Sequence, residues 1–95
     1  MAVFIQAELR GVTADQYDAL TAKLQALPGD VFEGCLAHVA VQTESGFEVF
    51  DLWESEAAME KFAQAMMPVA AEAGISERGG RPKIMQVHSY WVPGT

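Results

Sequence analysis

The segment EVFDLWES, residues 48–55, has the composition of a β-strand but carries a carboxylate in its middle. Apolar side chains flank Asp51 on both sides, and a carboxylate buried among them without a partner is costly. Asp51 therefore needs a wet environment or a partner. The candidate partners are His38, His88 and a basic side chain of a second subunit. A structural ion pair and a catalytic pair both fit this sequence.

Outward from this segment, periodicity predicts four strands and two helices in the order βαββαβ. Residues 2–9 alternate as a strand, and 83–92 form the last one. Thr13 and Gln16 have capping-box spacing for a helix that ends before Pro28. Ser55 caps the second helix, which Pro68 should kink or restart and Gly74 should end. Residues 75–82 form a solvated loop that contains Arg78 and Arg81.

Residues 35–42 and 47–53 are expected to form a hairpin. If Ser45 and Gly46 make its two-residue turn, His38 pairs with Trp53 and Ala40 with Asp51. This register separates an aliphatic face from a face that carries polar and aromatic groups.

The chain is expected to be one domain, residues 1–95, of the α+β class. Two right-handed crossovers give a ferredoxin-like βαββαβ sandwich with an antiparallel sheet of strand order 4-1-3-2. The residues expected beneath the helices are Val3, Ile5, Val39, Val41, Phe50 and Leu52. The opposite face should carry Phe4, Gln6, Glu8, Leu36, His38, Ala40, Val49, Asp51, Trp53, Gln86, His88 and Tyr90.

That second face carries too many apolar side chains to be exposed to solvent and too many polar ones to be buried in a core without water. A second copy of the chain packed sheet to sheet, with a cavity between the sheets, is the simplest cover. A homodimer is therefore predicted.

The run FDLWESEAAMEKF, residues 50–62, resembles the strand-to-helix junction of dimeric α/β-barrel proteins, particularly the antibiotic-biosynthesis monooxygenase-like group. Element order and length fit over essentially the whole chain. The resemblance implies two subunits with facing sheets and a pocket, either between sheet and helices or within the barrel, that Trp53 lines. The chain departs from the pattern in two ways: it has no Asn for the pocket, and Phe62 stands where the wider group often has His. The matching positions are Phe50, Asp51, Trp53, Ser55, Ala57, Ala58 and Met59.

The residues and the resemblance together suggest a small cofactor-independent enzyme, monooxygenase-like, that acts on an aromatic or polyketide-like molecule. His38 or His88 would be the base and Asp51 would orient it. The substrate-binding candidates are Phe4, Gln6, Glu8, Trp53 and Tyr90. An isomerase or cyclase in the same pocket, a non-catalytic dimeric ligand-binding module, and a haem-degrading enzyme are the alternatives.

The charge and the cysteine and histidine content of the sequence limit the classes of partner and cofactor that are expected. Six basic and thirteen acidic residues give a net charge of −7, which disfavours nucleic acid and anionic membranes. The single cysteine, Cys35, should be an inert thiol on the helix-facing side of the sheet. The spacing of His38 and His88 matches no metal-ligand motif, so no metal and no cofactor are expected. Without an expected signal peptide or membrane span, the predicted location is cytoplasmic.

Overall fold

The computed structural model describes residues 1–75 and 82–94, and its elements follow the predicted order. They are β1 (Val3–Arg10), α1 (Ala14–Gln25), β2 (Cys35–Thr43), β3 (Gly46–Trp53), α2 (Glu56–Glu72) and β4 (Lys83–Gln86). The strands form one antiparallel sheet in the order β2-β3-β1-β4, which confirms the ferredoxin-like topology.

Both helices begin where the sequence places their caps. Thr13 and Gln16 form the complete capping box of α1, and the Ser55 hydroxyl accepts from the Ala58 amide at the start of α2. α2 continues through Pro68 instead of restarting there. Proline removes the amide that would bond to the carbonyl of Gln64, and Gln64 is exposed, so water can replace that bond.

Gly74 ends α2 as predicted. Its φ of 74° is left-handed, and its amide bonds to the Ala71 carbonyl. The Ile75 amide bonds to the Ala70 carbonyl, so the pair of bonds has the pattern of a Schellman motif. Ile75 and Ala70 are both buried, which fixes the end of α2 against the core.

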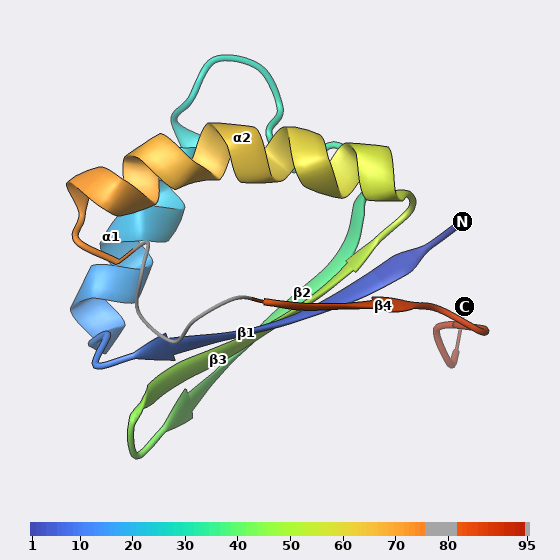
Figure 1. The fold of residues 1–95 in the computed structure, drawn as a ribbon, viewed down its shortest axis with the longest axis horizontal. Helices are drawn as coiled ribbons and strands as arrows, with labels where there is room; N and C mark the ends of the chain where they lie inside the picture. The colour runs from blue at the N-terminus through green and yellow to red at the C-terminus, as the bar shows by residue number, and fades with distance from the viewer. Residues whose placement is uncertain (76–81, 95) are drawn as a thin grey trace.

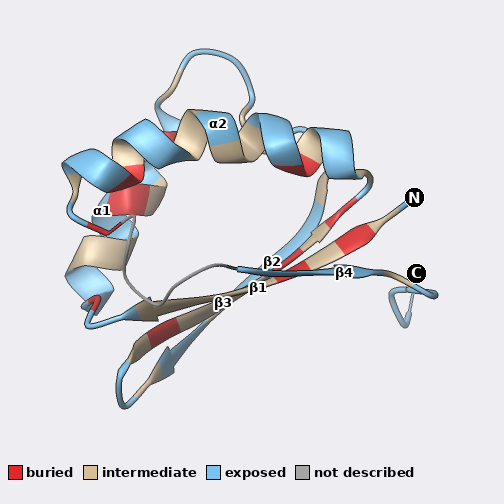
Figure 2. Ribbon diagram, viewed as in Figure 1, coloured by how far each residue is buried: buried red, intermediate tan, exposed pale blue. Residues whose placement is uncertain are grey.

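The molecule has two layers. Figure 1 shows both helices above the same face of the sheet and the other face without a covering element. Figure 2 shows that the buried positions of the strands gather beneath the helices, while β4 is exposed along its length. Neither helix of the described chain has the length and apolar character needed to cross a membrane.

The core consists of two groups of buried side chains. One lies where the helices meet and contains Val12, Leu20, Leu24, Phe47, Ala70 and Ile75. The other lies near the start of α2 and contains Val3, Ile5, Trp53 and Met59. The space between these groups becomes the site described below.

The sheet face beneath the helices differs from the predicted one. β1 pairs with β3 so that Val3 lies opposite Trp53 and Ile5 opposite Asp51. Paired residues share a face, so Asp51 and Trp53 lie with Val3 and Ile5 between the sheet and the helices. His38, Ala40 and Val49 accompany them, and the expected core residues Val39, Val41, Phe50 and Leu52 lie on the uncovered face with Phe4 and Gln6.

The hairpin register is also shifted by two residues from the predicted one. Thr43 pairs with Gly46, so Glu44 and Ser45 form the turn, and His38 pairs with Asp51 rather than Trp53. Gly46 is the cause, because it also pairs with Arg10 of β1. A Cβ at Gly46, whose φ is 143°, would lie 2.2 Å from the Leu9 carbonyl oxygen. Only glycine permits this close approach.

β2 contains a β-bulge between Cys35 and Ala37. Cys35 lies opposite Trp53 and His38 lies opposite Asp51, although the two β2 residues are three apart in sequence. The extra residue therefore brings both Cys35 and His38 to the helix-facing side.

The last strand is shorter than predicted. β4 ends at Gln86, and residues 87–94 lack regular strand structure. The register with β1 accounts for this end, because Gln86 pairs with Val3, the first residue of β1. Residues 76–81 lie outside the described residues, and with them most of the predicted basic loop, including Arg78 and Arg81.

The Gly46→Ala substitution should destabilise the protein by about 3 kcal/mol, because the methyl group meets the Leu9 carbonyl. Gly29→Ala is the matched control: its φ is also positive, at 78°, but no atom lies within 4 Å of the new Cβ. The control substitution should lower the free energy of unfolding by only about 1 kcal/mol. Urea denaturation measures both, and equal losses would contradict the role assigned to Gly46.

Candidate functional site

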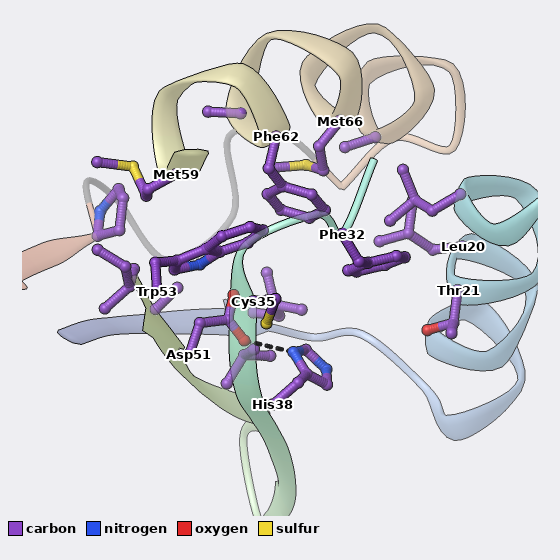
Figure 3. Close-up of a pocket in the computed structure, with 18 of the residues that line it drawn as sticks. Leu20, Thr21, Phe32, Cys35, His38, Asp51, Trp53, Met59, Phe62 and Met66 are labelled. Atoms are coloured by element: carbon purple, nitrogen blue, oxygen red, sulfur yellow. Dashed lines mark hydrogen bonds and ion pairs between the residues drawn. The ribbon is translucent and has the colours of Figure 1, made fainter. Parts of the chain in front are cut away.

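A cavity of about 480 Å³ lies between the sheet and the two helices. Its wall includes members of both core groups, among them Ile5, Leu24 and Met59. Figure 3 shows side chains converging on it from β2, β3 and both helices. The size falls in the range typical of sites for small organic ligands.

The polar centre of this cavity is a chain of three side chains. Asp51 of β3, only 8% exposed, accepts a hydrogen bond from Nδ1 of His38 on the neighbouring strand, drawn as a dashed line in Figure 3. The other ring nitrogen of His38, Nε2, is hydrogen-bonded to the hydroxyl of Tyr17 on α1. All three residues line the cavity. Asp51 thus has its partner within its own polypeptide chain.

Burial and the Asp51 carboxylate influence the pKa values of His38 and Tyr17. The hydrogen bond that His38 donates to Asp51 is the main cause that raises the pKa of His38, and the carboxylate charge adds to it, while burial opposes both. Burial raises the pKa of the Tyr17 hydroxyl, and the charge of Asp51 acts in the same direction. Tyr17 therefore stays protonated at neutral pH, with a hydroxyl proton to donate in its hydrogen bond with His38.

Trp53 contributes an unpaired donor. Its side chain is 1% exposed, and its indole Nε1 is buried without a hydrogen-bond partner among the described residues. A buried donor without an acceptor costs about 1–3 kcal/mol. A ligand with an acceptor atom within reach of Nε1 would recover this energy on binding.

Aromatic rings form the rest of the wall near Trp53. The ring of Phe62 on α2 lies 5.1 Å from that of Trp53 and 5.2 Å from that of Phe32, centroid to centroid. Figure 3 places Phe62 and Phe32 above the polar pair, towards the helices. Flat apolar walls of this kind suit a planar ring system.

The structure brings together three of the eight residues predicted for the site, His38, Asp51 and Trp53. Gln6 lies on the uncovered face, where its amide donates to Glu48 over 3.0 Å, and Phe4 stacks on Phe50 there. Glu8 borders the cavity, but its carboxylate pairs with the exposed Arg10.

His88 and Tyr90 are not part of this site. Both are exposed and lie beyond the end of β4. The prediction assumed that the last strand continues to residue 92, and its early end removes both side chains from the sheet.

Tyr17 is the site residue that the sequence did not identify. It was assigned to the apolar stripe of α1, where it does pack, with its ring centroid 5.0 Å from that of Phe47. A usable signal was present: Thr21 follows Tyr17 by one helical turn, so two hydroxyl groups interrupt a stripe that otherwise contains leucine.

Cys35 also lines the cavity, and burial is the main cause that raises the pKa of its thiol. This agrees with the expected unreactive thiol. Among residues 1–75 and 82–94, no three His, Cys, Asp or Glu side chains are grouped so that they could hold a metal ion.

No family model and no curated protein matches this sequence. Solved structures do match it over nearly the full chain. A provisionally named antibiotic biosynthesis monooxygenase from Chloroflexus aurantiacus is 17% identical, with a TM-score of 0.62 over 96% of this chain and 98% of its own.

Two Streptomyces proteins match as well. SnoaB of Streptomyces nogalater, a cofactor-independent oxygenase, has 10% identity and a TM-score of 0.63 over 94% of each chain. The ActVA-Orf6 monooxygenase of Streptomyces coelicolor, solved with nanaomycin D, has 18% identity and a TM-score of 0.53 over 98% of this chain and 92% of its own. The resemblance predicted from residues 50–62 is thus confirmed at the level of the fold: this chain has the fold of antibiotic biosynthesis monooxygenase structures.

The His38–Asp51 pair should make stability depend on pH. Because the folded state raises the pKa of His38 above its unfolded value of about 6.5, the folded protein holds the proton more tightly. The stabilisation is complete below that pH and is lost as the pH rises through the folded pKa. Denaturation midpoints measured between about pH 5.5 and 8.5 give the slope of stability against pH.

The His38→Gln variant should lose this part of the slope, and His88→Gln should keep it, since His88 is exposed outside the site. If both variants keep the wild-type slope, His38 is not the group that titrates.

Proposed function

We propose that this chain is a cofactor-independent oxygenase that acts on a small aromatic molecule carrying an acidic phenol. The observation that carries the proposal is the His38–Asp51 pair in the wall of a largely apolar, aromatic-lined cavity. The fold shared with SnoaB, a cofactor-independent oxygenase, and with ActVA-Orf6, which binds nanaomycin D, supports the same choice.

The acid–base chemistry follows from the pair. Neutral His38 takes the phenolic proton, and the adjacent Asp51 carboxylate stabilises the imidazolium that forms. The phenolate that remains is electron-rich at its ring carbons, one of which bonds to dioxygen to give a peroxide anion. Protonation by the imidazolium and loss of water convert that carbon to a carbonyl, so the products are a quinone and one water. The substrate supplies all the electrons.

Other residues of the cavity wall would bind the substrate ring and stabilise the charge that develops during the reaction. Phe62 and Phe32 offer apolar faces to the ring, and water is displaced when the ring binds. The Trp53 N–H is buried and has no acceptor among the described residues, so a substrate or peroxide oxygen that reaches it would gain a hydrogen bond.

Oxygen consumption with a panel of phenols and naphthols tests the proposal. The His38→Gln variant should lose about 10²–10⁴-fold in rate, the usual contribution of a positioned base. Because the neutral imidazole is the active form, the wild-type rate should rise with pH through the raised pKa of His38. The Asp51→Asn variant should be slower and should have its acid limb at lower pH.

The control for these variants is His88→Gln, which should retain wild-type rates. Wild-type oxygen uptake by His38→Gln would rule out the proposed base. Turnover that continues in the absence of oxygen would instead identify an isomerase or a cyclase that uses the same base.

We also propose that two copies pack through their uncovered sheet faces. Val39, Val41 and Met85 are 52%, 44% and 40% exposed on this face, next to the stacked rings of Phe4 and Phe50. A contiguous apolar face of this kind marks an interface in a soluble protein.

Native mass spectrometry should therefore show twice the chain mass. Val39→Lys should shift the equilibrium to monomer, because it buries a charge at the interface. Met67→Lys changes a similarly exposed apolar residue of α2 and should leave the dimer intact. A wild-type monomer at micromolar concentration would contradict this arrangement.

A further inference from the structure

The starting observation is that His38 has no ring nitrogen free to meet a ligand. Asp51 occupies Nδ1 and the Tyr17 hydroxyl occupies Nε2. A carboxylate accepts hydrogen bonds only, so in the neutral ring the proton resides on Nδ1 and Nε2 accepts from Tyr17. A base with this geometry is reached through the hydroxyl.

The Tyr17 ring is held in place from several sides. It is nearly parallel to Phe47, with an interplanar angle of 14°, and to the His38 imidazole, with an angle of 9°. One turn later in α1, the Thr21 hydroxyl donates to the main-chain carbonyl of Tyr17 over 3.1 Å. Tyr17 and Thr21 both line the cavity, which makes Tyr17 part of its wall as well as a neighbour of His38.

We infer that Tyr17, a residue that nothing in the fold comparison assigns, is the catalytic residue that contacts the acidic hydroxyl of the ligand and relays its proton to His38. This step rests on the proposed function and specifies how the base reaches its substrate. The ligand O–H bond breaks as its proton passes to the Tyr17 oxygen, and the Tyr17 O–H bond breaks as its proton passes to Nε2. Tyr17 is unchanged at the end, the ligand is an anion, and the imidazolium faces Asp51.

The position of the Tyr17 hydroxyl favours one class of ligand over another. The new anion lies next to the O–H of Tyr17, which donates to it as soon as the relay is complete. A phenol or enol gains from this donor, whereas an activated C–H acid bonds poorly to the Tyr17 oxygen before transfer. The site should therefore act on phenols and enols in preference to carbon acids.

The test uses 4-nitrophenol, whose absorption distinguishes phenol from phenolate, and the full-length wild-type protein. Tyr17→Phe keeps the ring on Phe47 and removes the hydroxyl. In this variant the pH of half-ionisation of the bound probe should rise by about one unit, a tenfold change in the equilibrium. Tyr90→Phe is the matched control, because it removes the hydroxyl of an exposed tyrosine that does not line the cavity, and it should ionise the probe as the wild type does.

A second readout requires no ligand. Nitrogen-15 shifts of the His38 ring should show the Nδ1–H tautomer in the wild-type protein when the ring is neutral, with an Nε2 signal that moves in Tyr17→Phe and stays in Tyr90→Phe. A neutral ring protonated on Nε2 overturns the inference, as does a Tyr17→Phe protein that ionises the probe like the wild type, or a wild-type protein that leaves it un-ionised.

These outcomes are separable from those of the oxygenase test. A protein that ionises the probe through Tyr17 but consumes no oxygen with any phenol would retain the relay and reject the oxygenase. Oxygen consumption by a Tyr17→Phe protein at the wild-type rate would retain the oxygenase and reject the relay.

Discussion

The alignment of β1 against β3 is the constraint on which the site depends. β3 is a central strand, so its register with β1 decides which of its faces lies beneath the helices. With Ile5 opposite Asp51, the carboxylate is enclosed by the subunit and must find a partner there. His38, directly opposite on β2, supplies it. The cavity, its aromatic wall and the pair of His38 and Asp51 all follow from this placement.

The polar groups of this interior differ in how far their hydrogen-bonding capacity is used. Asp51 and His38 satisfy each other, and Tyr17 completes the chain from α1. The Trp53 indole, buried more deeply than any of them, has no acceptor. Natural proteins rarely leave such a group unpaired, and where they do, a bound ligand or water is a common explanation. The interior thus combines a chain of three hydrogen-bonded side chains with one buried, unpaired donor.

Much of the fold was predictable from sequence because its signals are local. The caps at Thr13, Ser55 and Gly74 and the alternation of the strands each depend on neighbouring residues, and they gave the correct element order and strand order. The face assignment failed because it depends on which residues of β1 and β3 are opposite each other, and those residues are between 36 (Arg10 and Gly46) and 50 (Val3 and Trp53) apart in sequence. His38 was one of three candidate partners of Asp51 that the sequence left open, whereas Tyr17 was concealed by its place in an apolar helical stripe.

The bulge in β2 has a consequence for any comparison of this chain with other sequences. Cys35 and His38 both face the helices only because one extra residue lies between the two paired segments of the strand. In a relative whose second strand is regular, the residues that face the cavity alternate without interruption. A gapless alignment keeps only one side of the bulge in phase, so it matches either Cys35 or His38 with a residue on the opposite face. One strand residue, gained or lost, therefore changes which of these two side chains faces the cavity.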